Sequence, residues 1–195
     1  MGTGIGFELS GISFGESFPE VIASARAGEE WGWTVLYRAV AGPVTGFLRG
    51  RGASDPIDLA GDVFFELARS ITKFEGDESD FRTYVFSTAH RKLAEAMESH
   101  TPHRSVLADD VLGKLRGDNF VVDLKADELI TENVRTAFAA LNPEQRDVLS
   151  LRILGGLTLR ETATVVDRGI GQVRSIQRRA LTKIRNLPAV AEALT

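Results

Sequence analysis

A pair of helix signals near the C-terminus constrains the fold of this chain most strongly. Thr158 is followed three residues later by Glu161, which is the capping-box pattern at the start of a helix. Asp167, Arg168 and Gly169 then favour a tight turn, because Asp and Gly tolerate the left-handed backbone conformation. A longer helix follows, with an apolar residue at every third or fourth position: Val173, Ile176, Ala180, Ile184 and Leu187. The order of short helix, three-residue turn and longer helix predicts a helix-turn-helix.

The longer helix of this motif is basic, although the chain as a whole is mildly acidic. The 195 residues include 23 Lys or Arg and 27 Asp or Glu, which gives a formal net charge of −4 at pH 7. Residues 168–185 nevertheless hold six cations and no carboxylate. With the apolar stripe facing the core, the cations point outward and can meet the phosphates or base edges of DNA; the alternative is a solvated face that binds nothing. The residues expected to contact DNA are Arg168, Gln172, Arg174, Ser175, Arg178 and Arg179.

In the N-terminal half of the sequence, the spacing of apolar residues predicts three further helices. They fall in residues 33–51, 58–74 and 80–97, and Gly42-Pro43 should kink or break the first. The acidic segment FEGDESD separates the second helix from the third. The chain is therefore expected to be all-α.

Changes in composition along the chain predict two small helical domains joined by a linker. Residues 1–18 are rich in Gly and Ser and are expected to form a flexible tail before a helical domain at 19–100. Residues 101–127 contain Pro, Gly and clustered charges, which indicates a linker with a short helix near 106–115. The second domain, 128–195, contains the helix-turn-helix, and LNPEQ predicts a helix start there, with Asn142 as the cap.

Composition also excludes several functions. The chain has no cysteine, so a disulfide, a zinc–thiolate site and a thiol nucleophile are excluded. No Ser-His-Asp order, catalytic carboxylate pair, metal-ligand spacing or P-loop stands out, so we expect no enzyme, no metal and no cofactor. The sequence contains no run of about 18 apolar residues, so it predicts no membrane span, and the protein is expected to be cytoplasmic.

Two parts of the chain resemble a known family. Residues 141–187 resemble region four of bacterial sigma factors. Their sequence is LNPEQRDVLSLRILGGLTLRETATVVDRGIGQVRSIQRRALTKIRNL. Region two resembles residues 36–97, and the two together are similar to the extracytoplasmic-function (ECF) group of the sigma-70 family. The resemblance implies a protein that binds core RNA polymerase, recognises and opens promoter DNA, and in many members is held inactive by an anti-sigma factor.

The resemblance also assigns roles within region two. The helix from Phe81 would bind the downstream promoter element and single-stranded DNA, since an aromatic ring can stack on a base while cations hold phosphates. Its outward residues are expected to be Arg82, Phe86, Ser87, His90 and Arg91. The alternative for Phe86 is packing against another helix. Three carboxylates at four-residue spacing share one helix face and would dock on the polymerase clamp, unless they form an ordinary solvated face: Asp58, Asp62 and Glu66.

Two other functions are compatible with a helix-turn-helix. One is a transcriptional regulator with a helical sensor or dimerisation domain, which binds duplex DNA without polymerase. The other is an interaction protein whose basic helix is incidental. The N-terminal half favours the sigma factor, because its helix, acidic segment and second helix follow region two in order and spacing.

Overall fold

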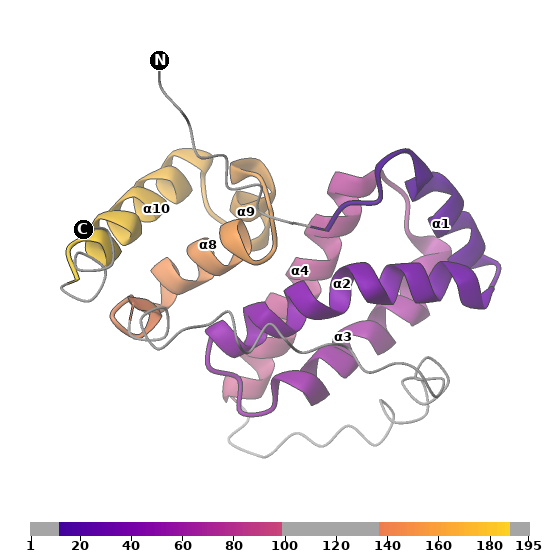
Figure 1. Ribbon diagram of the computed structural model, residues 1–195, viewed down its shortest axis with the longest axis horizontal. Helices are drawn as coiled ribbons and strands as arrows, with labels where there is room; N and C mark the ends of the chain where they lie inside the picture. Colours follow the sequence, from indigo (N-terminus) through magenta and orange to yellow (C-terminus); the bar gives the residue numbers. More distant parts are fainter. Residues whose placement is uncertain (1–11, 99–136, 188–195) are drawn as a thin grey trace.

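The computed structural model describes residues 12–98 and 137–187, and every regular element in these ranges is helical (Figure 1). We call these ranges the N-terminal half and the C-terminal half. The elements are η1 (Gly15–Ser17), α1 (Phe18–Arg26), α2 (Glu30–Gly50), α3 (Pro56–Ser70), η2 (Ile71–Lys73), α4 (Glu78–Glu98), α8 (Pro143–Ile153), α9 (Leu159–Val165) and α10 (Ile170–Arg185). Within the described ranges, no helix combines the length and apolar character needed to span a membrane. The all-α expectation is confirmed.

Helices α1 to α4 pack around a core that is rich in aromatic rings. Phe81 of α4 is 1% exposed and has three aromatic neighbours. Its ring centroid lies 5.6 Å from that of Phe74, 5.8 Å from that of Phe18 and 6.0 Å from that of Phe14. These spacings fall in the range of favourable tilted and edge-to-face contacts. The start of α4 is therefore fixed by residues from the chain's first described segment and from the loop before it.

The expected tail over residues 1–18 is too long, because residues from position 12 onward are packed. Ile12 is 3% exposed, and its carbonyl accepts a hydrogen bond from Arg82 at 3.2 Å. The backbone N–H of Phe14 donates to Glu78 at 3.1 Å. Ile12 and Phe14 thus contact α4 through these two hydrogen bonds, and the ring of Phe14 also packs against that of Phe81. Residues 1–11 lie outside the described ranges.

Of the kink or break expected at Gly42-Pro43, the break does not occur: α2 runs without interruption from Glu30 to Gly50 with Pro43 inside it. Proline removes one backbone donor from the helix. The residues on either side, Val40 and Val44, are fully buried. Their packing against the core holds the helix together across the missing hydrogen bond.

The C-terminal half forms the expected helix-turn-helix. Asn142 and Thr158 each complete a capping box, with Gln145 and Glu161 respectively, at the starts of α8 and α9. Asp167, in the turn between α9 and α10, has a φ of 50°, the left-handed conformation that the sequence predicted. The apolar stripe of α10 is buried at Val173, Ile176 and Ala180.

The two halves are in contact, which the sequence did not predict. Leu151, Leu157 and Val165 of the C-terminal half belong to the same buried cluster as Phe47 and Phe86 of the N-terminal half. Helix α9 lies beside α4 (Figure 1). The two predicted domains thus share a hydrophobic core. The linker expected at 101–127, with its helix at 106–115, lies outside the described residues.

We expect Phe81→Ala to lower the free energy of unfolding by about 3–5 kcal/mol, because it removes a fully buried ring and leaves a cavity between three other rings. Urea unfolding followed by circular dichroism measures the change. Phe65→Ala is the matched control, since Phe65 is only partly buried and lies against Arg69. Equal losses in the two variants would contradict a core centred on Phe81.

Candidate nucleic-acid interface

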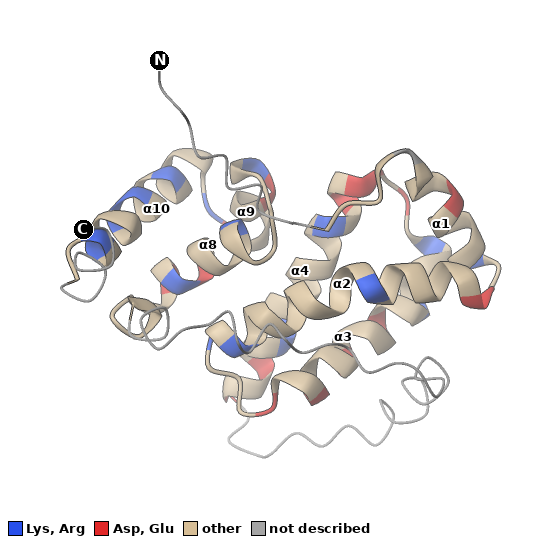
Figure 2. Cartoon of the chain, in the orientation of Figure 1, with Lys and Arg blue, Asp and Glu red and all other residues tan. Residues whose placement is uncertain are grey.

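Helix α10 presents a basic surface to solvent. Figure 2 shows Lys and Arg along this helix and no acidic residue on it. The α10 cations, by which we mean Arg174, Arg178, Arg179, Lys183 and Arg185, are all exposed. The helix is seated by its buried apolar stripe, so its outward face is fixed as a unit. Such a helix can enter a major groove and place cations near phosphates and base edges.

The residues around the start of α10 already make local contacts. Gln172 accepts a hydrogen bond from the backbone N–H of Gly169 at 3.0 Å, so its amide oxygen caps the helix and its NH₂ group remains available to a base. Arg168 lies 3.4 Å from Glu144, and both side chains are about half exposed. The surface pair with Arg168 is weak, so it can be exchanged for a phosphate at little cost.

A shallow groove beside the turn is lined partly by residues that the sequence analysis did not select. It is lined by Arg160 and Thr164 of α9 and by Arg168, Ile170 and Gln172 around the start of α10. Ile170 is 40% exposed, and an exposed aliphatic group at this place can contact a thymine methyl. Arg160 escaped attention because TLRE was interpreted only as a capping signal. Both side chains enlarge the expected DNA surface.

The residues of α4 that were expected to face outward differ in how far they are exposed to solvent. Arg91 is about half exposed and pairs with Glu66 and Glu95. Hydrogen bonds to Glu66 and Glu95 raise the pKa of Arg91 above its ordinary value. Ser87 is partly buried. The outward placement of Phe86 is wrong for this structure: the ring is fully buried and meets Phe47 edge-on, with centroids 5.9 Å apart.

The C-terminal half packs against the face of α4 that carries Phe86. A Cβ added at Gly155 would lie 2.9 Å from Cζ of Phe86, so only a glycine allows the backbone to come so close. His90 lies one turn further along α4, 3.7 Å from Asp147 of α8. Arg82, one turn earlier, donates to Glu161 of α9 at 3.0 Å. Three of the five expected residues therefore contact the C-terminal half.

Glu161 is the best-connected carboxylate of this contact. It is 4% exposed, accepts from Ser79 at 2.6 Å and from Arg82, and also caps α9 through Thr158. Burial alone raises the pKa of Glu161, but the hydrogen bonds from Ser79, Thr158 and Arg82 outweigh it and lower the pKa below its ordinary value. The ionised form is therefore the one that joins α4 to α9.

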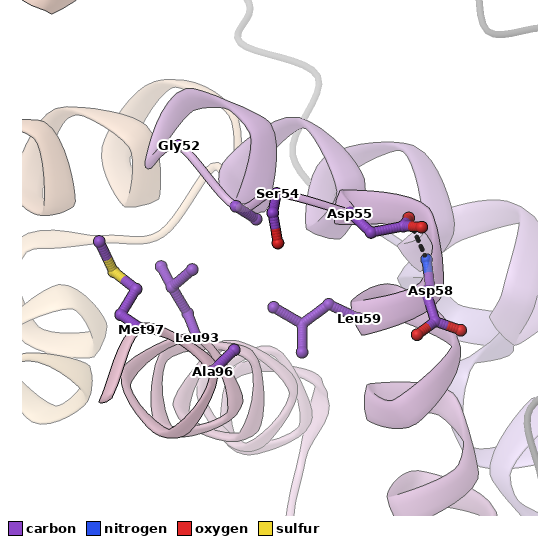
Figure 3. A pocket seen from close by; sticks show the side chains of 9 residues that line it. Gly52, Ser54, Asp55, Asp58, Leu59, Leu93, Ala96 and Met97 are labelled. Atoms are coloured by element: carbon purple, nitrogen blue, oxygen red, sulfur yellow. Dashed lines mark hydrogen bonds between the residues drawn. The ribbon is translucent and has the colours of Figure 1, made fainter. Parts of the chain in front are cut away.

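The three carboxylates of α3 do not form a single exposed face. Asp62 is buried at 8% exposure, and Glu66 pairs with Arg91 and Lys92 of α4. Asp58 lies at the rim of a cavity of about 220 Å³ between the start of α3 and the end of α4. Figure 3 shows Leu59 and Leu93 pointing into this cavity, with the carboxylates of Asp55 and Asp58 at one side. The acidic feature here is therefore Asp55 and Asp58 at the rim of a hollow that has both polar and apolar lining residues.

Comparison with known proteins identifies both halves. Residues 137–186 match the family described as Sigma-70, region 4, and residues 36–102 match Sigma-70 region 2. The chain is 26% identical to the ECF RNA polymerase sigma factor BldN of Streptomyces coelicolor over 86% of its own length, and this alignment spans 64% of BldN. It is 27% identical to the ECF RNA polymerase sigma-E factor of Haemophilus influenzae, with 85% of this chain and 92% of the relative aligned.

A solved structure of CnrH in complex with the cytosolic domain of CnrY has a similar fold. The TM-score is 0.62 at 18% sequence identity, and the superposition covers 92% of this chain and 100% of that one. The likeness supports the all-α arrangement described above.

The contact through Glu161 should weaken in acid. A carboxyl whose pKa is lowered by folding stabilises the protein above its unfolded pKa, here 4.5, and this contribution disappears as pH falls through the folded pKa. Glu161→Gln should therefore destabilise the protein at pH 7 and differ less and less from the wild type below about pH 4.5. Urea unfolding at a series of pH values measures both curves.

Glu20→Gln serves as the control, because Glu20 is exposed in the first turn of α1. Its curve should follow the wild type throughout. A Glu161→Gln curve that stays parallel to the wild type down to pH 3 would show that the contact does not depend on the ionised carboxylate.

Proposed function

Because the chain belongs to the ECF group of the sigma-70 family, we propose that it is a sigma factor, which binds core RNA polymerase and directs promoter recognition and opening. The observation that carries the proposal is the combination of regions two and four in one chain, with a basic helix-turn-helix in the second of them. On this proposal the protein is a binding factor and not an enzyme. It acts in the cytoplasm, where the polymerase works.

Helix α10 is the proposed reader of the upstream promoter element. Its exposed cations would hold phosphates on both sides of the major groove, while Arg174 and Arg178 lie one turn apart on the same flank and can reach base edges. Gln172 and Ser175 lie nearer the start of the helix, with Arg168 in the turn before it. The absence of any carboxylate on α10 keeps the whole face attractive to DNA.

Helix α4 is the proposed site for the downstream element and the displaced single strand. Arg82 and His90 lie one turn to either side of Phe86, so phosphates and a base can be bound on one face. Ser87 and Arg91 continue this surface towards the end of the helix. This role requires the C-terminal half to leave α4, because Phe86 has no exposed surface while the two halves are in contact.

The start of α3 is the proposed contact with core polymerase. The carboxylates of Asp55 and Asp58 border a cavity whose apolar lining includes Leu93 and Met97, and Met97 is 55% exposed. Such a site fits a partner that offers an apolar side chain flanked by cations. Asp62 and Glu66 would then act mainly within the protein, through the ion pairs and packing of α3. An anti-sigma protein is a further proposed partner, as in many members of the ECF group.

Run-off transcription tests the proposal. The purified chain is incubated with bacterial core RNA polymerase and a fragmented genomic library, beside reactions that lack either component. Transcripts that require both components establish the function and give the promoter sequences. Duplex binding without polymerase, and no new transcript with it, would instead indicate a helix-turn-helix regulator.

Arg174→Ala and Arg178→Ala should each weaken binding of the upstream element by about 1–3 kcal/mol, because a bidentate contact to guanine has that magnitude. The measurement is promoter binding by the holoenzyme on matched and upstream-mutated promoters. Arg69→Ala is the control, since it removes an exposed arginine from α3 in the other half of the chain. If both α10 variants bind every promoter like the wild type, the assigned face is wrong.

Asp58→Lys should slow association with core polymerase on the order of tenfold at low ionic strength, because charge at a docking surface acts mainly on the association rate. Biolayer interferometry with immobilised core polymerase at two salt concentrations measures the rate. Glu20→Lys reverses the same charge on exposed α1 and should have a small effect. Equal rates for wild type and Asp58→Lys would exclude docking at this rim.

A further inference from the structure

The groove beside the turn of the helix-turn-helix suits the edge of a base pair better than a phosphate. It lies between α9 and the start of α10, and its lining includes Arg160, Arg168 and the exposed carboxylate of Asp167. A carboxylate repels the negative oxygens of a DNA backbone, so Asp167 disfavours a phosphate inside the groove. The two arginines are exposed and long enough to hold phosphates beyond it. The groove itself is then left for the edge of a base.

Ile170, the first residue of α10, is the largest apolar side chain that lines the groove. It precedes the buried stripe of α10 by one step of three residues, yet it is 40% exposed, whereas Val173 and Ile176 are 0% and 4% exposed. A single exposed aliphatic residue is common on protein surfaces and by itself indicates nothing. Here it lies within the basic surface expected to enter the major groove, where thymine is the base that offers a methyl group.

Gln172 lines the same groove because its side chain turns back to cap α10. Its amide oxygen accepts from the backbone N–H of Gly169 at 3.0 Å. A glutamine that binds adenine uses both its oxygen and its NH₂ group, and here the oxygen is already engaged. The free NH₂ group is a donor, so it suits an acceptor on a base edge. Thymine combines such an acceptor, O4, with the methyl group that Ile170 can contact.

Gly171, between these two residues, adds an independent observation. A Cβ added there would meet nothing within 4 Å, and the backbone φ of Gly171 is not positive. Neither packing within the chain nor backbone conformation therefore requires a glycine, although glycine is a poor helix former. A residue without a side chain at this place does allow a ligand to approach the helix backbone closely. The edge of a base pair beside Ile170 and Gln172 is such a ligand.

We propose that Ile170 and Gln172 together recognise one thymine of the upstream promoter element, Ile170 through the methyl group and the Gln172 NH₂ group through O4. The inference rests on the proposed function for its ligand, duplex promoter DNA, and on the groove for the identity of the base. It adds a specificity determinant at the start of α10 to the contacts proposed for Arg174 and Arg178 further along the helix.

Replacement of thymine by uracil tests the contact of Ile170, because uracil lacks only the methyl group. Each thymine of the upstream element, on either strand, is replaced in turn, and holoenzyme binding to the promoter duplex is measured. One replacement should weaken binding of the wild type about fourfold, the effect of one buried methyl group. Holoenzyme with Ile170→Ala should bind the thymine and uracil duplexes equally. A loss of the same size in Ile170→Ala would overturn the proposal.

Leu181→Ala is the matched control. Leu181 is an aliphatic residue of the same helix, is 45% exposed, and does not line the groove. Holoenzyme with Leu181→Ala should keep the preference of the wild type for thymine over uracil. If Leu181→Ala abolishes this preference as Ile170→Ala does, the contact is not specific to Ile170 and the proposal is wrong.

A change of base preference tests Gln172. A pair of 5-methylcytosine with guanine keeps the methyl group at the recognised position but presents an N4 donor in place of the O4 acceptor. The wild type should bind this duplex more weakly than the thymine duplex. Gln172→Glu should reverse the order, because a carboxylate accepts from N4. The ratio of the two affinities is the measured quantity, so a general loss of affinity in the variant does not affect the result. An unchanged ratio would overturn the role of Gln172.

The wild-type chain separates this inference from the proposed function. If it transcribes promoters with core polymerase but binds every uracil duplex like the thymine duplex, or if the upstream element contains no thymine on either strand, the function stands and thymine recognition is wrong. If it yields no transcript, the proposed function is wrong. The same uracil and 5-methylcytosine comparisons are then made with the free chain on duplexes selected from a random pool, and failure to select any duplex overturns the inference as well.

Discussion

Phe86 meets Phe47 edge-on within the N-terminal half and the backbone of Gly155 on its other side, so one ring joins the cores of both halves. The rest of the arrangement depends on this contact. It brings α9 to the start of α4, where Glu161 meets Arg82, and it brings α8 to the end of α2, where Asp147 meets Arg51. Helix α4 is therefore buried on two sides, while α10, attached to the far side of the C-terminal half, keeps its basic face in solvent.

Apolar burial and ion pairing have different roles in this contact. Removing Arg51 and Asp147 from water costs free energy that their mutual attraction only approximately repays, so the pair adds little net stability. Burial of the apolar side chains of Phe86, Leu151 and Leu157 removes no charge from water, and it supplies the favourable free energy of the contact between the halves. The ion pairs instead fix which surfaces meet, because a shifted arrangement would leave buried charges without partners.

Features encoded within a few neighbouring residues were predictable from the sequence. The capping boxes at Asn142 and Thr158, the left-handed turn at Asp167 and the buried stripe of α10 all depend on contacts three or four residues apart. The burial of Phe86 was not predictable in this way. The apolar stripe formed by Phe81, Val85 and Ala89 identifies one buried face of α4. Helical periodicity does not reveal that a second face of the same helix is also buried. Arg51 and Asp147 are 96 positions apart, and no local pattern pairs them.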